Sequence, residues 1–396
     1  MSLALPILRI DSLLPPPKKL HLMHTTRTDP GRTQTYDPGQ QEIHDNELVS
    51  RYQSVLGEYK LSWTSHLRFS RRLGSGGQGI VFLSDRKGSD GFTLPVAVKV
   101  FSPDRFPTAV AYEESMARIA RVAAKVARIQ HENLLDVQNF IDRRRIRIMS
   151  MEWVEGFDLR RLMDPTLLDR IRHRLSDRRW RQLNEIVMTA GPRQPRFKPG
   201  VAIAIVRDCL AALAALHREG IAHCDLKPAN VMLKRSGHAK IIDFGSAIEI
   251  DDPPLRRSCT PAYSAIEVLE GRPFSPRSDL ASLGYVLVEL LSGRQVFEGL
   301  ESFDELVQAK RELPRRLHEI LPRDVACNEL LMQFCQRLIA PDENLRFRSA
   351  DDANLNDFGA ATFHRQLIKS DLASEYDNEI RILVSELLEI PELQNE

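Results

Sequence analysis

Cysteine is scarce in this 396-residue sequence, and its few cysteines are scattered along the chain. No two of them form a CxxC pair, and none is grouped with histidines as the ligands of a zinc ion would be. This spacing disfavours both a zinc site and a disulfide framework, and it fits a reducing compartment. The five cysteines are Cys209, Cys224, Cys259, Cys327 and Cys335.

Net charge and long apolar runs are also lacking. The formal net charge is +1, so no overall basic field favours nucleic acid as a partner. No apolar segment approaches the ~20 residues that cross a bilayer. Arg9 and Asp11 interrupt the apolar N-terminus, which makes it a poor signal peptide. We therefore expect a soluble, cytoplasmic protein with no membrane span.

The order of the expected elements divides the chain into parts. Residues 1–60 are rich in Pro, Thr, Gln and Asp, so we expect a largely disordered N-terminal extension. Residues 66–358 begin with strand patterns and continue with helical ones, which predicts an α+β protein with a small β-rich lobe and a larger α-helical lobe. Residues 164–199 are interpreted as an Arg-rich helical insertion in the second lobe. Strands are expected at 66–73, 80–84, 94–100 and 145–153, and helices at 109–130, 202–218, 278–293 and 326–339.

Residues 359–396 form an acidic tail in which apolar residues recur at helical spacing. We favour a helix that docks on its own domain, and a helix that binds a partner is the alternative. The apolar stripe consists of Tyr376, Ile380, Leu383, Leu387 and Ile390.

Residues 74–81 read Gly-Ser-Gly-Gly-Gln-Gly-Ile-Val and fit the pattern GxGxxGxV. Glycines let the backbone close over phosphates, because no Cβ obstructs the approach. Dinucleotide-binding folds share the pattern, but there the loop opens a helix, whereas Ile80 begins an expected strand. By itself the loop fits an ordinary hairpin as well as a nucleotide site. Lys99, at the end of the next strand, can reach phosphates as a fixed cation.

Two later segments contain the groups that phosphoryl transfer requires. Residues 222–230 read Ala-His-Cys-Asp-Leu-Lys-Pro-Ala-Asn, and residues 241–245 read Ile-Ile-Asp-Phe-Gly. The reaction needs a carboxylate to accept a proton, oxygen ligands for Mg²⁺, and cations on the phosphates. Asp225 fits the first role, Asn230 and Asp243 fit the second, and Lys99 with Lys227 fits the third.

In this order and at this spacing, the motifs resemble those of the eukaryotic-type serine/threonine protein kinase superfamily from about His66 to about Phe358. The resemblance implies the two-lobed kinase fold, ATP and Mg²⁺ as cofactors, and a protein substrate with a Ser or Thr acceptor. It implies Asp225, Lys227, Asn230, Lys99 and Glu114 as catalytic residues, and Asn230 and Asp243 as metal ligands. The implied ATP-binding residues are Gly74, Ser75, Gly76, Gly77, Gln78, Gly79, Val81, Ala97, Lys99, Met151, Glu152, Val154 and Asp158.

Other positions match the same family. Residues 259–267 resemble the end of the activation segment, and residues 279–284 resemble the buried helix that anchors the catalytic loop. Arg346 falls where the family pairs an arginine with Glu267. Lys227 together with Thr260 resembles the serine/threonine pattern, because tyrosine kinases place different residues after the catalytic aspartate.

Three departures from the family pattern stand out. Cys224 replaces the usual arginine before Asp225, as in non-RD kinases, so we hypothesise that activity does not require activation-loop phosphorylation. Glu114 is expected to pair with Lys99, although His131 lies about eight residues farther along than the family spacing implies; an extended helix accommodates this, and Glu113 is the alternative. Ile266 and Ala281 replace the usual proline and tryptophan at packing positions.

We therefore predict an ATP-dependent kinase that phosphorylates Ser and Thr hydroxyls of proteins, with Asp225 as the catalytic base. The alternative is a nucleotide-binding pseudokinase that acts as a scaffold or regulator; the presence of Lys99, Asp225, Asn230 and Asp243 disfavours it. A small-molecule phosphotransferase is disfavoured by the extended segment between Asp243 and Glu267, which in protein kinases receives a peptide.

Overall fold

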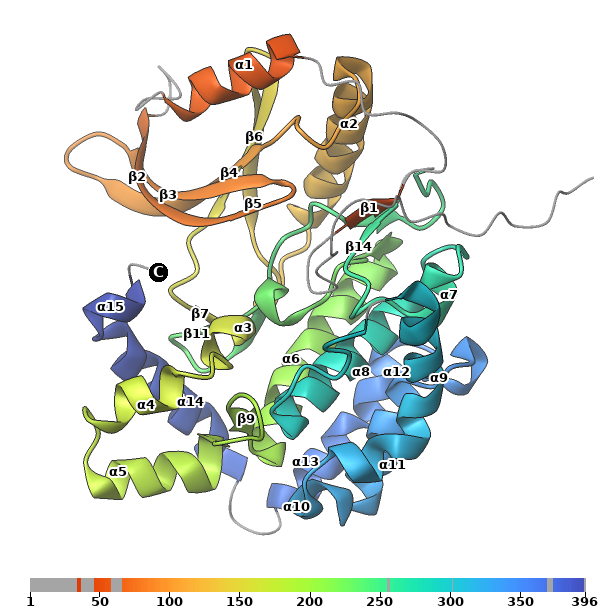
Figure 1. Cartoon of the computed structure of the whole chain (residues 1–396). Helices are drawn as coiled ribbons and strands as arrows, with labels where there is room; N and C mark the ends of the chain where they lie inside the picture. Colours follow the sequence, from red (N-terminus) through yellow and green to blue (C-terminus); the bar gives the residue numbers. More distant parts are fainter. Residues whose placement is uncertain are drawn as a thin grey trace, which may run out of the picture.

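The computed structural model describes residues 34–36, 46–57, 66–254, 257–300, 302–368 and 373–394. Two lobes are apparent in Figure 1, with the β-rich lobe at the top and the helical lobe below. The predicted two-lobed α+β fold is thus confirmed.

A five-stranded antiparallel sheet forms the N-lobe, in the spatial order β2-β3-β4-β6-β5. The central strand β4 is buried from Val96 to Phe101, because the sheet is covered on the side of the helix α2 (Ala109–Val126). Thr108 begins that helix, since its side chain accepts a hydrogen bond from the Ala111 N–H at 3.1 Å. The strands are β2 (His66–Gly76), β3 (Gly79–Lys87), β4 (Thr93–Phe101), β5 (Val137–Arg143) and β6 (Ile146–Glu152).

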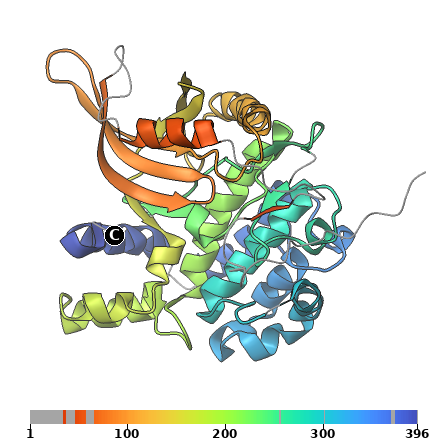
Figure 2. The ribbon, with the colours of Figure 1, turned by 45° about the horizontal axis from the view of Figure 1, so that its top comes forward.

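Part of the N-terminal extension is ordered, contrary to the expectation for residues 1–60. Residues Asn46–Leu56 form α1, and Leu48, Tyr52 and Val55 are buried in the main core. Their spacing of four and three residues places them on one face of the helix. Figure 2 shows this helix lying against the N-lobe sheet. The sequence analysis missed α1 because its apolar face spans only three turns and lies amid polar residues.

The C-lobe is built around two long buried helices, α6 (Pro199–Arg218) and α8 (Pro276–Ser292). Among the described residues, α6 is the helix long and apolar enough to cross a membrane, which the sequence analysis did not expect of any segment. Most of its apolar surface is buried in the lobe core, so its composition is explained by its central position. The other C-lobe helices are α3 (Leu159–Leu162), α7 (Ile266–Leu269), α9 (Phe303–Ile320), α10 (Arg323–Ala326), α11 (Glu329–Leu338), α12 (Ala350–Leu355) and α13 (Ala360–Ile368).

Short strands connect the lobes and carry the catalytic segments. Strand β11 (Val231–Lys234) pairs on one side with β7 (Gly156–Asp158), which follows the last N-lobe strand, and on the other with β12 (Ala239–Ile241). Strand β10 (Ile221–Ala222) pairs with β13 (Ile248–Glu249). The residues between these strands include the two predicted catalytic segments, so both are held at the junction of the lobes.

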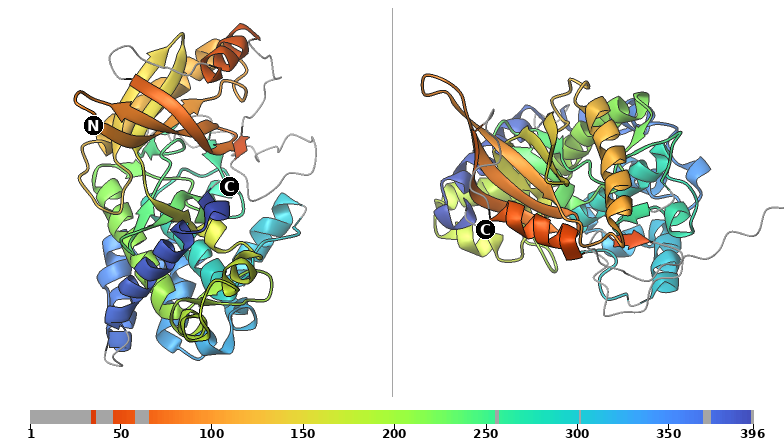
Figure 3. Two further views of the ribbon diagram at one scale, coloured as in Figure 1. Left: turned by 90° about the vertical axis from the view of Figure 1, so that its left-hand side faces the viewer. Right: turned by 90° about the horizontal axis from the view of Figure 1, so that it is seen from above.

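Residues 164–199 contain two short helices, α4 (Leu167–Arg172) and α5 (Asp177–Gln182). A π-helical turn (Leu183–Val187) follows, and β8 (Met188–Thr189) then pairs with β9 (Arg196–Phe197). The tail helices α14 (Ala373–Leu388) and α15 (Pro391–Gln394) lie beside this insertion, as Figure 3 shows in its left view. Arg179 joins the two parts: its guanidinium contacts Glu379 at 2.5 Å and Glu386 at 2.8 Å.

The predicted apolar stripe of the tail is buried from Tyr376 to Ile390, and α14 packs against α6. Two glycines make room for it. A Cβ on Gly200 would come within 2.2 Å of the Tyr376 ring, and a Cβ on Gly237 would come within 2.3 Å of the Asp377 carbonyl oxygen. The tail helix therefore docks on its own domain, which was the favoured interpretation.

One pairing joins distant parts of the sequence. Strand β1 (Gln34–Tyr36) pairs antiparallel with β14 (Arg257–Cys259), with Thr35 opposite Ser258. Figure 1 shows β1 beside β14 at the right of the molecule. The strand β14 lies in the segment that follows Asp243, so the N-terminal extension contacts the region next to the catalytic residues.

Candidate active site

The glycine loop is the turn between β2 and β3. The chain continues from Gly79 as a strand, as predicted, and not as the helix of a dinucleotide fold. Gly79 has φ of 140°, and a Cβ there would lie 2.0 Å from the Val100 carbonyl oxygen, so no other residue fits without strain. Gly74 and Gly76 lie in open space at the end of β2. The loop can therefore approach a ligand with its backbone.

Lys99 lies on β4 between Val81 of β3 and Met149 of β6. Its ammonium contacts the Asp243 carboxylate at 2.5 Å and the side-chain oxygen of Gln78 at 2.6 Å. The lysine is buried, and a buried charge is costly unless it is paired. Asp243 provides that pairing inside the cleft.

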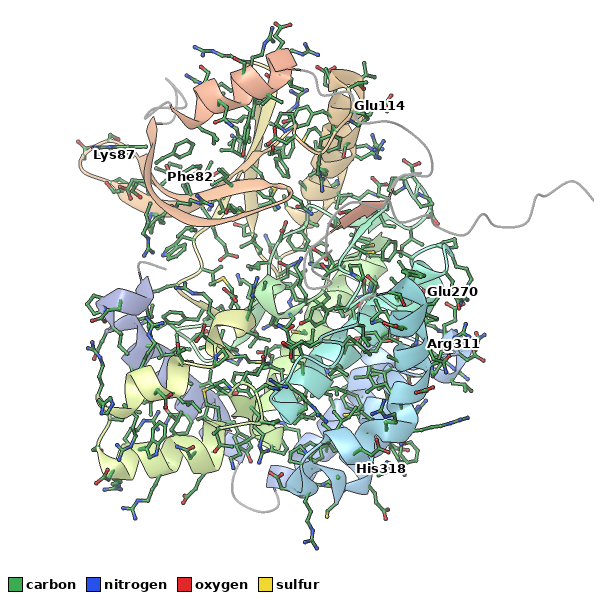
Figure 4. The ribbon with its side chains drawn as sticks, viewed as in Figure 1. Phe82, Lys87, Glu114, Glu270, Arg311 and His318 are labelled. Carbon is green, nitrogen blue, oxygen red and sulfur yellow. The ribbon has the colours of Figure 1, made fainter. Side chains whose placement is uncertain are left out.

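The predicted pair between Lys99 and Glu114 is absent from the structure, and this prediction is wrong for the conformation observed. Glu114 is exposed and lies at the upper end of α2 (Figure 4). Glu113, the alternative, bonds to Arg145 at 2.8 Å. The inward face of α2 is apolar, with Met116, Ile119 and Val122 buried. The helix thus turns both glutamates away, because a stripe that packs in the core sets its rotation.

Asp225, Lys227 and Thr260 form one hydrogen-bonded cluster. The Lys227 ammonium lies 3.0 Å from Asp225 Oδ2 and 3.0 Å from the Thr260 hydroxyl oxygen. The Thr260 hydroxyl donates to Asp225 Oδ1 at 2.6 Å. Asn230 donates to the Asp225 backbone carbonyl at 2.7 Å. The sequence placed these four residues up to 35 positions apart, and the fold brings them together.

Asp279 holds the backbone of this catalytic loop. Its two carboxylate oxygens accept hydrogen bonds from the N–H groups of His223 at 2.8 Å and Cys224 at 2.9 Å. Burial raises the pKa of Asp279, but the bond from His217 and these N–H donors more than offset it, and the pKa is lowered. Cys224, which donates one of these bonds, has φ of 66°, a conformation that a residue with a Cβ adopts at a cost.

Asp243 lies at the start of the Asp-Phe-Gly segment. Burial raises its pKa, but the Lys99 ammonium and the Gly245 N–H more than offset that effect, and the pKa is lowered to about 2. Both of these partners contact Oδ1. The carboxylate is therefore ionised at neutral pH, and its other oxygen has no hydrogen-bond partner among the described residues.

Asn230 and Asp243 fit a Mg²⁺ site by their chemistry, because this cation prefers oxygen ligands and is held by few protein groups together with phosphate oxygens. The Asn230 amide donates its N–H to Asp225, so its oxygen is the end left for a cation. No group of three or more His, Cys, Asp or Glu side chains is arranged as a metal site in the described ranges. A Mg²⁺ ion held by this pair would therefore need further oxygen ligands from outside the chain.

The predicted adenine side of the cleft lies where β6 leaves the N-lobe. Met151 is buried and pairs with Ala97 of β4, which pairs in turn with Leu83 of β3. Glu152 accepts a bond from the Asp136 N–H at 2.7 Å and also pairs with Lys240. Val154, two residues after Glu152, is also buried. Residues from three strands therefore converge on this wall.

Asp158 has a structural task in addition to its predicted contact with the ribose. Its side chain accepts a hydrogen bond from the Arg161 N–H at 3.0 Å and so begins α3. Burial raises the pKa of Asp158. The side chain is thus held at the edge of the cleft by a short helix.

The end of the activation segment is fixed by the predicted pair of Glu267 and Arg346. Arg346 contacts both carboxylate oxygens of Glu267, at 2.6 and 2.8 Å, and both side chains are buried. Ser278 adds a third hydrogen bond to Glu267 at 2.8 Å. This fully bonded pair joins α7 to the segment before α12.

Sequence reasoning missed two features near the site. The amide of Gln78 contacts both Lys99 and Ser246, at 2.6 and 2.8 Å. Lys310 of α9 is fully buried over the rings of Tyr285 and Phe297 and donates to the Ala262 carbonyl at 2.6 Å. A glutamine in place of an apolar residue in a glycine loop was a visible signal for the first. No local sequence pattern predicted the burial of Lys310.

The comparisons agree with this geometry. The family model described as "Protein kinase domain" matches residues 67–358. The chain belongs to the protein kinase family. Among curated proteins it is similar to the serine/threonine-protein kinase PkaA of Streptomyces coelicolor, with 30% identity over 62% of this chain and 42% of that protein.

Two further relatives show the same likeness. The serine/threonine-protein kinase pkn2 of Myxococcus xanthus is 30% identical over 75% of this chain and 33% of its own length. The serine/threonine-protein kinase PrkC of Bacillus subtilis is 26% identical over 71% of this chain and 38% of its own length. This chain thus spans less than half the length of these relatives.

Proposed function

We propose that this chain is a serine/threonine protein kinase that acts in the cytoplasm, with ATP as phosphoryl donor and Mg²⁺ as metal. The observation that carries this proposal is the cluster of Asp225, Lys227 and Thr260, whose polar atoms lie 2.6 to 3.0 Å apart. It places a carboxylate and a cation side by side at the lobe junction, where the transfer needs both.

Asp225 receives the acceptor hydroxyl of the substrate and takes its proton as the oxygen attacks the γ-phosphorus. The bond between this phosphorus and the bridging oxygen to the β-phosphate breaks, and ADP leaves. Thr260 and Lys227 hold the carboxylate in place, and Lys227 lies near enough to stabilise the negative charge of the group in transfer. Lys99 and the glycine loop hold the other phosphates.

Mg²⁺ held by Asn230 and Asp243 would neutralise charge on the phosphate oxygens. Asp243 suits this role because its carboxylate stays ionised down to a pH of about 2. The proposed serine/threonine preference rests on Lys227 and Thr260, which both contact Asp225. The pseudokinase alternative is disfavoured because Lys99, Asp225, Asn230 and Asp243 are all present: Asn230 bonds to Asp225, and Lys99 pairs with Asp243.

The test is transfer of label from γ-labelled ATP to a library of Ser- and Thr-containing peptides. Asp225→Asn removes the proton acceptor and keeps the shape, so we expect at least a hundredfold lower rate with ATP binding retained. The matched control is Asp169→Asn, at an exposed position of α4 remote in the fold. If wild type and Asp225→Asn incorporated equally little label while both bound ATP, the pseudokinase alternative would hold.

A further inference from the structure

The catalytic lysine of this chain has no carboxylate partner on α2. The helix carries two glutamates, of which Glu113 bonds to Arg145 and Glu114 is exposed. A cavity lies between α2 and the segment that follows Asp243, and its wall on the helix side contains no acidic residue. That wall consists of Ser115, Arg118, Ile119, Arg121 and Val122. The helix therefore turns apolar and basic side chains toward the site.

The side chain of Gln78 takes up the position left open. It is 7% exposed, although it belongs to the glycine loop. Its oxygen accepts a hydrogen bond from the Lys99 ammonium at 2.6 Å, and its nitrogen donates to the Ser246 hydroxyl at 2.8 Å. Its backbone carbonyl accepts from the Ser102 N–H at 3.0 Å. One residue thus ties the glycine loop, β4 and the segment after Asp243 together.

The glycine at position 245 is matched to this contact. A Cβ on Gly245 would lie 1.9 Å from the Gln78 side-chain oxygen and 3.0 Å from the Lys99 ammonium. Such distances are well below van der Waals contact, so the amide fits because residue 245 has no side chain. This close approach is independent of the hydrogen bonds. It shows that the Gln78 amide occupies a tight space between Gly245 and Lys99.

We propose that Gln78 is the positioning residue of Lys99 and replaces the helix glutamate that this site lacks. This inference rests on the proposed function. The amide oxygen gives the Lys99 ammonium a second contact beside the one with Asp243, and so fixes the direction in which the ammonium points in the cleft. The same amide holds the glycine loop down on the Asp243 segment through Ser246, which brings the loop backbone over the nucleotide.

The test compares Gln78→Ala with Gln78→Glu in the full chain. Alanine removes both hydrogen bonds, so we expect the KM for ATP to rise about tenfold and kcat to change by less than about threefold. Glutamate keeps an oxygen acceptor for Lys99 and one for the Ser246 hydroxyl, so it should return KM to within about threefold of wild type. Gln138→Ala, on β5 of the same lobe, is the matched control.

Nucleotide binding is measured by calorimetry on the same variants. If wild type binds ATP but transfers no phosphate, the function proposed above fails while the role of Gln78 is still tested by binding. Equal KM values for Gln78→Ala and wild type would contradict the proposal. It would be contradicted equally if Glu114→Gln raised KM as much as Gln78→Ala, because a helix glutamate would then be the working partner.

A second inference rests on the pairing of β1 with β14. Strand β14 ends directly before Thr260, whose hydroxyl contacts Asp225. Ser258, opposite Thr35, is therefore about 7 Å along the strand from Thr260, at ~3.3 Å per residue. An extended peptide paired on this edge would carry its hydroxyls past the catalytic carboxylate.

The edge of β14 is covered by the chain itself. Strands β1 and β14 form a two-stranded sheet, so β1 occupies the hydrogen-bonding groups of one edge of β14. Extended peptides bind such edges through main-chain hydrogen bonds. Helix α1, nine residues farther along, is docked on the N-lobe and keeps β1 near its site at a high local concentration.

We propose that β1 competes with extended peptide substrates for the β14 edge. Thr35→Pro removes a backbone N–H and the strand geometry, so it should lower the KM for a Ser/Thr peptide about fivefold and leave the KM for ATP unchanged. Thr35→Val keeps the strand and removes the hydroxyl, and it should behave as wild type.

Hydrogen exchange at residues 257–259 shows directly whether the pairing is lost in Thr35→Pro. An unchanged peptide KM, once exchange has shown that the pairing is lost, would contradict the competition. A fall in kcat on loss of the pairing would also contradict it, because β1 would then support the activation segment.

Discussion

Arg346 and Glu267 form a two-point ion pair in the interior of the C-lobe, with both side chains almost fully buried. Arg346 bonds to both oxygens of the carboxylate, and Ser278 donates a further hydrogen bond to one of them. Glu267 keeps a lowered pKa: burial raises it, and Arg346 more than offsets that effect. The pair is costly to break, since either partner alone would be a buried charge.

Arg346→Ala should therefore lower the free energy of unfolding by about 3 to 5 kcal/mol. The matched control is Arg272→Ala, whose pair with Glu343 is partly exposed and should be worth less than about 1 kcal/mol. Both are measured by chemical denaturation. Equal losses in the two variants would show that the buried pair contributes no more than a surface one.

Glu289 should make stability depend on pH. Burial raises its pKa to about 7, although Tyr263 and Gln194 bond to it. In the unfolded chain the group ionises near pH 4.5, so between about pH 4.5 and 7 the folded state holds a proton that the unfolded state has lost. The contribution is fully present below pH 4.5 and is lost as pH rises to 7.

Glu289→Gln removes this titration and keeps the shape of the side chain. The stability of wild type relative to the variant should thus fall by about 3 kcal/mol between pH 4.5 and 7.5, at 1.36 kcal/mol per pKa unit. Unfolding by denaturant at several pH values measures it. A difference that stays constant over this range would show that Glu289 titrates normally.

Gly200→Ala is expected to destabilise the protein, against the helix propensity of alanine. Propensity alone would favour alanine by ~0.5–1 kcal/mol within a helix. The added Cβ would collide with the ring of Tyr376, at 2.2 Å, and overpacking of this kind costs ~1–3 kcal/mol. The thermal midpoint should therefore fall.

The double variant Gly200→Ala with Tyr376→Ala is the control for this collision. When the ring is gone, alanine at 200 should become neutral or stabilising relative to Tyr376→Ala alone. If alanine at 200 were equally harmful in both backgrounds, the contact with the tail would not be the cause.

Cys224 should be chemically inert despite its place in the catalytic loop. Burial raises the pKa of its thiol well above the usual value, so little reactive thiolate forms at neutral pH. Cys327 is exposed. Alkylation of the folded protein, followed by mass spectrometry, should label Cys327 first and leave Cys224 unmodified. Fast labelling of Cys224 would contradict this and support a redox role.

Activity should also persist without a phosphate on the activation segment, because Cys224 offers no charge to bind one. Ser258→Ala tests this against purified wild type. The Ser258 hydroxyl is buried without a hydrogen-bond partner in the part of the chain that the structure describes, in a cavity that Arg105 and Arg118 also line. Loss of activity in a folded Ser258→Ala protein would mean that arginines of the N-lobe side bind the phosphate in place of residue 224.

The sequence predicted the lobes and the catalytic cluster because these depend on local motifs with fixed spacing. Asp225, Asn230 and Asp243 lie on loops whose geometry is set by a few neighbouring residues. The predicted pair of Glu114 with Lys99 was wrong because the rotation of α2 depends on how Met116, Ile119 and Val122 pack. A local sequence pattern contains no information on that packing. Nor does any local pattern register the pairing of Thr35 with Ser258, across more than 200 residues.

The docking of the tail determines when the domain is complete during synthesis. Helix α14 leaves the ribosome after the whole kinase domain, yet its Tyr376 ring packs over Gly200 and its Asp377 backbone lies against Gly237. Until then, the face of α6 that receives Tyr376 meets water. The growing chain therefore passes through a stage with an open apolar groove, which a chaperone can hold and a premature stop would leave uncovered.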